Sequence, residues 1–182
     1  MGLAKMRQNK KSVSPMSNEG RNAYVIEHLT AALVELLQNK TINNISISEL
    51  CDLAGVGRAS FYRNYGCMEE ILRAESERRF KKWANEYEAS DRSLHQMVKT
   101  LFCHLEANKD FYNLLYQNNL FNILKDVIIR NCGPKPEQPK EVAYSTAFIA
   151  YTLYGWIETW FTRGMQESAE EIAALTVTLE RN

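Results

Sequence analysis

The sequence predicts an all-α protein of about nine helices. Its 182 residues include only 8 Gly and 4 Pro, too few for the frequent turns of a β-sandwich or barrel. Two S-x-x-E motifs, Ser46–Glu49 and Ser168–Glu171, match the capping box, in which a hydroxyl and a carboxylate satisfy free amides at the start of a helix. Apolar residues make up 45% of the chain, which is enough to build a packed core.

Three of these helices are expected in the N-terminal third. Apolar residues from about 20 to 39 fall on one helical stripe, and a second, short helix follows the cap at Ser46. Gly55-Val56-Gly57 ends that helix, because glycine tolerates the left-handed conformation of a sharp turn. A third short helix is expected over about 58–65. Two short helices separated by such a turn are the signature of a helix-turn-helix.

The remaining chain is also expected to be helical. Its predicted helices cover residues 69–88, 93–107, 110–117, 120–129, 140–164 and 168 onward, with a Gly- and Pro-containing loop at 133–139. The sequence therefore predicts three parts. These are a flexible basic arm (1–18), a helix-turn-helix DNA-binding domain (19–68) and a helical effector-binding and dimerisation domain (69–182).

Charge is distributed unevenly between these parts. Residues 1–68 contain 8 Lys and Arg against 5 Asp and Glu, whereas residues 69–182 contain 14 against 17. The whole chain is neutral, which excludes a uniformly basic nucleic-acid coat protein but not a local basic surface. The arm carries four basic residues and no acid, so it either contacts DNA or is a solvated tail.

The third predicted helix carries the candidate DNA contacts. Its side chains include guanidinium groups, hydroxyls and an amide, which are the groups that bind phosphates and base edges. An ordinary solvated helix face is the alternative interpretation. The predicted DNA-binding residues are Ser46, Arg58, Ala59, Ser60, Tyr62, Arg63 and Asn64.

Residues 46–72 resemble the DNA-binding segment of the TetR/AcrR family of bacterial transcriptional regulators. The resemblance lies in Ala54-Gly55-Val56, then Ser60-Phe61-Tyr62, and then Tyr65, Glu69 and Ile71 in matching register. It implies that Ser46, Arg63 and Asn64 contact phosphates. It further implies that Arg58 and Ser60 reach base edges or adjacent phosphates, and that Tyr62 contacts the DNA backbone or a thymine methyl.

Two positions depart from the family pattern. Gly57 stands where the family usually has Ser, and Met68 where it usually has Lys. Each change removes a group that would bind phosphate, and each lost phosphate contact lowers the slope of log affinity against log salt by about 0.9. The departures concern the strength of DNA binding rather than the fold.

The C-terminal half predicts a dimer. The 140–164 helix is apolar on more than one face, and a second chain is the simplest cover for the extra face. Gly155, Trp160, Gly164 and the 168–172 segment resemble, more loosely, the ending of dihydroxyacetone-kinase-activator-like members of the family. The resemblance implies that the last two helices of each subunit form a four-helix dimer interface. The predicted interface residues are Trp156, Trp160, Ile172, Leu175 and Leu179.

Aromatic residues are concentrated in the C-terminal domain, where they indicate either a ligand pocket or simply core and dimer interface. In a pocket, tyrosine hydroxyls would orient a small apolar or aromatic effector. The predicted pocket residues are Phe102, Tyr112, Tyr116, Phe121, Tyr144, Phe148 and Tyr151.

Other kinds of site are not expected. The four cysteines form no CxxC motif or zinc-finger spacing, which favours free thiols in a reducing cytoplasm. His28, His95 and His104 are isolated, so no metal is predicted. No catalytic triad, phosphate loop or cofactor motif is present, so neither an enzyme nor a cofactor is predicted. No apolar run reaches the ~20 residues needed to cross a bilayer.

These observations predict a dimeric transcriptional regulator that binds a palindromic operator in double-stranded DNA. The family resemblance implies a repressor, while the residues themselves do not distinguish repression from activation. A small-molecule effector would release or modulate the regulator. The alternative is a co-regulator of the same fold that acts through a protein partner. A third class, a helical small-molecule binder or enzyme without DNA, would leave Arg58 and Arg63 dispensable.

Overall fold

The computed structural model describes residues 18–88 and 93–180. Within these ranges the chain forms nine α-helices and one short 3-10 helix, η1, without a strand, which confirms the predicted all-α fold. Most of the predicted basic arm, residues 1–17, lies outside the described residues.

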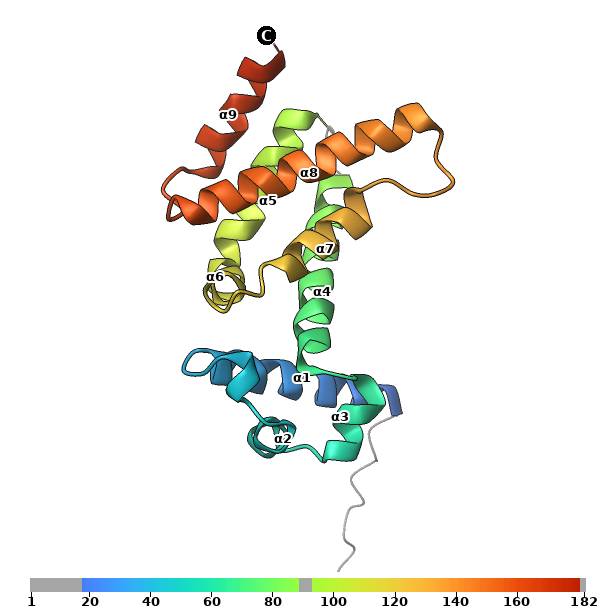
Figure 1. The fold of residues 1–182 in the computed structure, drawn as a ribbon, viewed down its shortest axis with the longest axis vertical. Helices are drawn as coiled ribbons and strands as arrows, with labels where there is room; N and C mark the ends of the chain where they lie inside the picture. Colours follow the sequence, from blue (N-terminus) through green and yellow to red (C-terminus); the bar gives the residue numbers. More distant parts are fainter. Residues whose placement is uncertain (1–17, 89–92, 181–182) are drawn as a thin grey trace, which may run out of the picture.

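The first helices form a compact group at the lower end of the molecule, here called the head (Figure 1). The second and third α-helices of the head both pack against the first. The centre of the head is apolar, with Leu29, Leu33, Leu50 and Phe61 fully buried. The elements of the head are α1 (Asn18–Leu37), η1 (Ile42–Asn44), α2 (Ile47–Ala54) and α3 (Arg58–Asn64).

The turn between α2 and α3 forms as the sequence predicts. Ser46 caps α2, because its Oγ accepts a hydrogen bond from the Glu49 amide at 3.1 Å. Gly55 follows α2 in the left-handed region, with φ 65°, a conformation that strains a residue with a Cβ. Gly57 precedes α3 in an extended conformation and supplies no side-chain cap. The chain therefore reverses within Gly55-Val56-Gly57.

Helix α4 (Met68–Glu88) connects the head to the second group of helices, here called the body (Figure 1). It packs against α1 of the head and against α5 and α7 of the body. Its buried apolar residues Ile71, Leu72, Phe80 and Trp83 are spaced as one face of a helix, as the sequence predicts.

The body is a bundle in which the first and last helices are neighbours. Helix α9 packs along α5, and α7 lies between α4 and α8. Helix α9 opens with the predicted capping box: the Ser168 amide donates to the Glu171 carboxylate at 2.8 Å, and Ser168 Oγ accepts from the Glu171 amide at 3.3 Å. The helices of the body are α5 (Leu94–Ala107), α6 (Lys109–Gln117), α7 (Asn122–Cys132), α8 (Lys140–Thr162) and α9 (Ala169–Glu180).

Helix α7 differs from its predicted range of 120–129 at both ends. It begins at Asn122, because Asn119 is left-handed with φ 59° and the Leu120 amide donates back to the Leu115 carbonyl at 2.9 Å. It continues to Cys132 and stops at Gly133. A Cβ at Gly133 would lie 2.3 Å from the Ile129 carbonyl oxygen, so only glycine fits this end of the helix.

Candidate nucleic-acid interface

Helix α3 turns one face to the interior of the head and the other to solvent. Phe61 is fully buried, and Tyr65, which follows the helix, is buried next to it, with ring centres 6.3 Å apart. Successive residues of a helix are rotated by about 100°. Arg63 therefore points away from Phe61, whereas Arg58 and Tyr62 lie toward the edges of the buried face; all three side chains are exposed. The buried rings determine which side chains α3 offers to a partner.

The other predicted DNA-binding residues lie beside this face. Ala59 is exposed, and Ser60 and Asn64 are half-buried, with the Asn64 amide donating to the Ser60 carbonyl at 2.9 Å. Ser46 is exposed at the start of α2, and its hydroxyl proton remains able to donate, because the cap uses the oxygen as an acceptor. The structure thus places six of the seven predicted residues on α3 and the seventh at the start of α2.

Charge on this surface is mixed. Arg58 contacts a neutral group, the Ser48 hydroxyl, at 3.5 Å, which links α3 to the first turn of α2 without neutralising the guanidinium. Glu49, by contrast, is paired with Lys40. The hydrogen bond from Lys40 holds the pKa of Glu49 below its usual value. This carboxylate is therefore ionised, and the charge of Lys40 balances its negative charge.

The start of α4 carries no cation toward this surface. Met68, which stands in place of the family's lysine, is half-buried and packs against the core. The carboxylate of Glu70 accepts a hydrogen bond from the Gly66 amide at 2.7 Å and so closes the loop between α3 and α4. An acidic residue therefore performs the capping at this position, next to the face that would meet DNA.

The residues predicted to line an effector pocket separate into two groups. Phe102, Tyr112 and Phe121 are buried in the body, and Tyr116 is half-buried beside Phe121 with ring centres 5.3 Å apart. Tyr144, Phe148 and Tyr151 lie instead on the outer face of α8 and are 79%, 73% and 53% exposed. The structure does not bring the seven residues together around one cavity within the chain.

A hollow of about 300 Å³ does lie between α5, α8 and α9. Phe148 is the one member of the predicted pocket set that lines it. Its lining is mostly apolar and consists of Leu94, Val98, Phe148, Ile149, Thr152, Leu153, Trp156 and Thr176.

The predicted dimer residues also differ in their placement. Trp160 and Ile172 are buried within their own chain, and the Trp160 indole donates to the Glu167 carbonyl at 2.8 Å. Trp156 is half-buried and Leu175 is exposed. The side chain of Leu179 lies outside the described part of α9. The structure therefore leaves Trp156 and Leu175 accessible to a second chain, whereas Trp160 and Ile172 hold α8 and α9 to the bundle.

Comparison with known proteins agrees with the family resemblance. Residues 92–181 match the TetR_C_8 family model, described as the transcriptional regulator C-terminal region. The chain is a TetR-like transcriptional regulator. No curated protein matches the chain. In the described residues of this TetR-like regulator, no helix is long and apolar enough to span a membrane.

Solved structures show the same fold. Lin0861 from Listeria innocua is similar to this TetR-like regulator with a TM-score of 0.72 and 16% identity, over 92% of this chain and 95% of the other. The dihydroxyacetone kinase operon activator DhaS is similar with a TM-score of 0.52 and 21% identity, over 85% of this chain and 93% of the other. At these identities the likeness concerns the fold alone.

One feature of this TetR-like regulator escaped the sequence interpretation. Glu75 and Ser76 fall on the apolar stripe of α4 and are buried, although both are polar. Ser76 donates to the Leu72 carbonyl at 2.7 Å, which satisfies it locally. Glu75 binds two arginines of its own helix, Arg78 and Arg79. The signal available in the sequence is an acid at a core position, followed by Arg at i+3 and i+4.

Proposed function

We propose that this TetR-like chain is a cytoplasmic, homodimeric DNA-binding repressor. It binds a palindromic operator and is released by a small apolar or aromatic effector. One observation carries the proposal: Phe61 anchors α3 in the core, and the helix leaves Arg58, Tyr62 and Arg63 exposed to solvent. A helix so anchored, preceded by a tight turn and a second helix, is suited to the DNA major groove.

The individual contacts follow from the side chains. Arg58 and Ser60 reach base edges, since guanidinium and hydroxyl groups read the donor and acceptor pattern of the major groove. Tyr62 and Ala59 contact the backbone or a thymine methyl. The remaining residues, Ser46, Arg63 and Asn64, bind phosphates and fix the register of the helix on the duplex.

The outer face of α8 supports the homodimer. Tyr144, Phe148, Ile149 and Tyr151 are large apolar side chains exposed on one helix, and Leu175 of α9 is exposed as well. A contiguous exposed apolar surface marks an interaction site. A two-fold dimer through this surface presents two α3 helices to half-sites about 34–36 Å apart, one turn of DNA.

The effector acts by shifting the dimer between two arrangements of its DNA-binding helices. The apolar hollow lined by Phe148 and Trp156 supports an apolar ligand, and it opens on the proposed dimer face. An effector that prefers one arrangement shifts the population toward it. A swing from 1:99 to 99:1 requires a difference in binding free energy of about 5.5 kcal/mol.

The decisive experiment is selection of binding sites from a random duplex library with the full chain. The selected site is then titrated by fluorescence anisotropy at two salt concentrations. We expect a palindromic site and an affinity that falls steeply with salt, because phosphate contacts release counterions. A folded dimer that enriches no sequence, with and without candidate effectors, would contradict the proposal.

Arg58→Ala should relax sequence preference at the base that Arg58 reads. We expect a loss of about 1–3 kcal/mol on the selected operator and a much smaller loss on an operator with that base pair changed. Anisotropy titrations of both duplexes measure the difference. Arg63→Ala is the matched control, because a phosphate contact weakens binding to all sequences equally. An equal loss for Arg58→Ala on both duplexes would assign it to phosphate instead.

A second candidate function is a co-regulator that acts through a protein partner. It is favoured by the start of α4, where half-buried Met68 and the capping carboxylate of Glu70 stand in place of a phosphate-binding cation. Salt dependence separates the two functions. A DNA-binding repressor shows a steep dependence on salt, whereas a protein-binding co-regulator retains its partner and enriches no DNA.

A further inference from the structure

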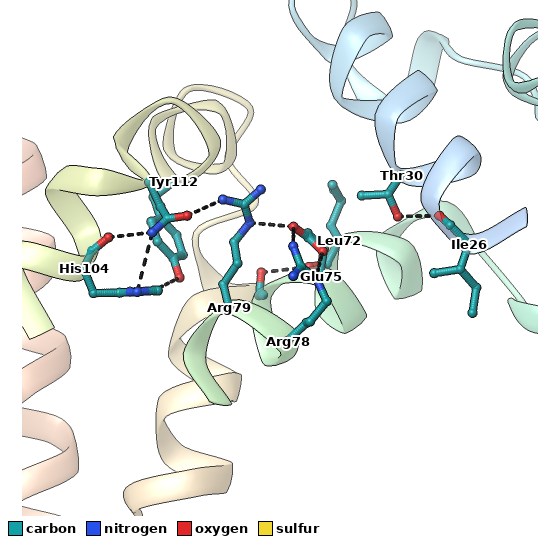
Figure 2. A network of polar contacts seen from close by, with 10 residues as sticks. Ile26, Thr30, Leu72, Glu75, Arg78, Arg79, His104 and Tyr112 are labelled. Atoms are coloured by element: carbon teal, nitrogen blue, oxygen red, sulfur yellow. Dashed lines mark hydrogen bonds and ion pairs between the residues drawn. The ribbon is translucent and has the colours of Figure 1, made fainter. Parts of the chain in front are cut away.

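Helix α4 carries a buried carboxylate at the level where the head meets the body. Glu75 is only 8% exposed. Its carboxylate accepts hydrogen bonds from Arg78 Nε and Nη2, both at 2.7 Å, and from Arg79 Nε at 2.6 Å (Figure 2). These bonds outweigh burial and hold the pKa of Glu75 below its usual value, so the group is an ionised acceptor for two guanidinium groups.

The two arginines have different second contacts. The Arg78 side chain is 67% exposed, and it pairs with Glu75 on its own helix. Arg79 is 26% exposed and crosses to the corner between α5 and α6. There its Nη1 donates to Asn108 Oδ1, and its guanidinium lies 4.5 Å from the centre of the Phe111 ring. Arg79 is therefore the arginine of this pair that joins α4 to the α5–α6 corner.

The α5–α6 corner is itself held in place. The side-chain amide of Asn108 donates to the His104 carbonyl at 2.8 Å, and the His104 ring shares a hydrogen bond with the Tyr112 hydroxyl at 3.0 Å (Figure 2). Tyr112 is fully buried. The acceptor that Arg79 meets is thus fixed to the core of the body and cannot follow α4 freely.

The other end of this cluster lies at the head. The charge of Glu75 contributes, after burial, to raising the pKa of Tyr65, the residue that ends α3. Helix α1 packs on α4, and Asn118 of the body donates to the Leu37 carbonyl of α1 at 3.4 Å. Any change in the angle between α4 and the α5–α6 corner therefore changes how the head is presented.

We propose that Arg79 is a positioning residue that sets the orientation of the DNA-binding head by locking α4 to the α5–α6 corner. The inference rests on the proposed function, because an orientation matters only if the head binds DNA. The guanidinium suits this role, since its planar fork donates in two fixed directions at once. A lysine ammonium could pair with Glu75 but could not also hold Asn108 and cover the Phe111 ring in the same geometry.

The test uses Arg79→Lys, with Arg78→Lys as the matched control. Both variants keep a cation beside Glu75, and only the first disturbs a contact to the body. The native thiols of Cys67, just before α4, and Cys103, on α5, are exposed and take spin labels. Burial raises the pKa of the Cys51 and Cys132 thiols, which disfavours their labelling. Labelled chain is diluted with unlabelled chain, so that distances within one chain are measured.

Double electron–electron resonance should give a narrow Cys67–Cys103 distance distribution for the parent chain. We expect Arg79→Lys to broaden it at least about twofold, and Arg78→Lys to broaden it less than half as much. An unchanged width for Arg79→Lys, or equal broadening by both variants, would overturn the proposal. If Arg79→Lys does not fold, Asn108→Ala takes its place, because it removes the side-chain acceptor and leaves both arginines on Glu75. This measurement needs no DNA.

A second measurement asks whether the lock acts on DNA binding. The two variants are titrated with operators whose half-sites are moved apart or together by single base pairs. For Arg79→Lys, the ratio of the affinity for the preferred spacing to that for a wrong spacing should fall at least about threefold. For Arg78→Lys, this ratio should stay as in the parent chain. A broadened distance with unchanged spacing preference would overturn the positioning role. Failure of every chain to bind any operator would instead count against the proposed function, and the distance measurement would still decide whether Arg79 locks α4.

Discussion

A chain with Trp160→Glu should lose its folded body rather than become a folded monomer. Trp160 is 3% exposed, and its ring centre lies 5.4 Å from that of Phe102 and 5.3 Å from that of Phe161. Removing a buried Trp costs about 3–5 kcal/mol, and a buried unpaired carboxylate adds to this cost. Since domains are stable by only about 5–15 kcal/mol, thermal unfolding followed by circular dichroism should show no cooperative transition near that of the parent.

Phe148→Glu should have the opposite outcome. Phe148 is exposed on α8, so a charge there leaves the core intact and introduces like charges across a two-fold interface. We expect a folded chain that elutes as a monomer on size exclusion, while the parent elutes as a dimer. Leu53→Glu, at an exposed apolar residue of α2 in the head, is the matched control and should remain dimeric. A dimeric Phe148→Glu would contradict the α8 interface.

Stability should fall as the pH decreases from about 6.5 toward 4 because of His104. Burial, with a smaller effect of the nearby Arg79 and Lys82 charges, lowers the pKa of His104 from 6.5 to about 4. The unfolded chain therefore binds a proton at a pH where the folded chain does not. The stabilisation is fully present above pH 6.5 and is lost as the pH falls to 4. Allowing for partial solvation of the ring, this amounts to about 2 kcal/mol.

The measurement compares the parent with His104→Gln in urea unfolding across this pH range. Glutamine retains a hydrogen-bonding side chain for Tyr112 but does not titrate. The free energy of unfolding of the parent should fall by about 2 kcal/mol more than that of the variant. Parallel curves would show that His104 does not titrate differently in the folded and unfolded chains.

Local signals in the sequence were sufficient for the helices. Both capping boxes cap their helices, and Gly55-Val56-Gly57 forms the turn, because hydroxyl caps and left-handed glycines act within a few residues. The predicted start of α7 was wrong because the local signal there is weak. The left-handed Asn119 that delays it is asparagine rather than glycine, so it gave a weaker signal.

The faces of the body helices could not be assigned in this way. An apolar stripe has the same spacing whether it meets its own core, a ligand or a second chain. Trp160 and Phe148 both lie on α8 and are both large and aromatic, yet one is buried and the other exposed. Helix α9 packs along α5, a pairing that no local pattern indicates. The DNA-binding candidates were easier to choose, because they lie on one short helix that follows a tight turn and buries Phe61, which leaves few other side chains.

The contacts of the arginines around Glu75 could not be predicted from the sequence either. Its i+3 and i+4 arginines are visible in the sequence, and such pairs normally lie on a solvated helix surface. Which arginine reaches Asn108 depends on how α4 lies against the α5–α6 corner, and that is set by tertiary packing.

The packing of α9 on α5 also determines the order in which the chain can fold as it is synthesised. The helices of the head pack on one another and on the start of α4, and all of these residues are synthesised first, so the head can form early. Helix α5 packs along α9 (Ala169–Glu180), which is synthesised well after it. On the ribosome, the part that carries the candidate DNA contacts therefore emerges before α9, without which the body cannot complete its packing on α5.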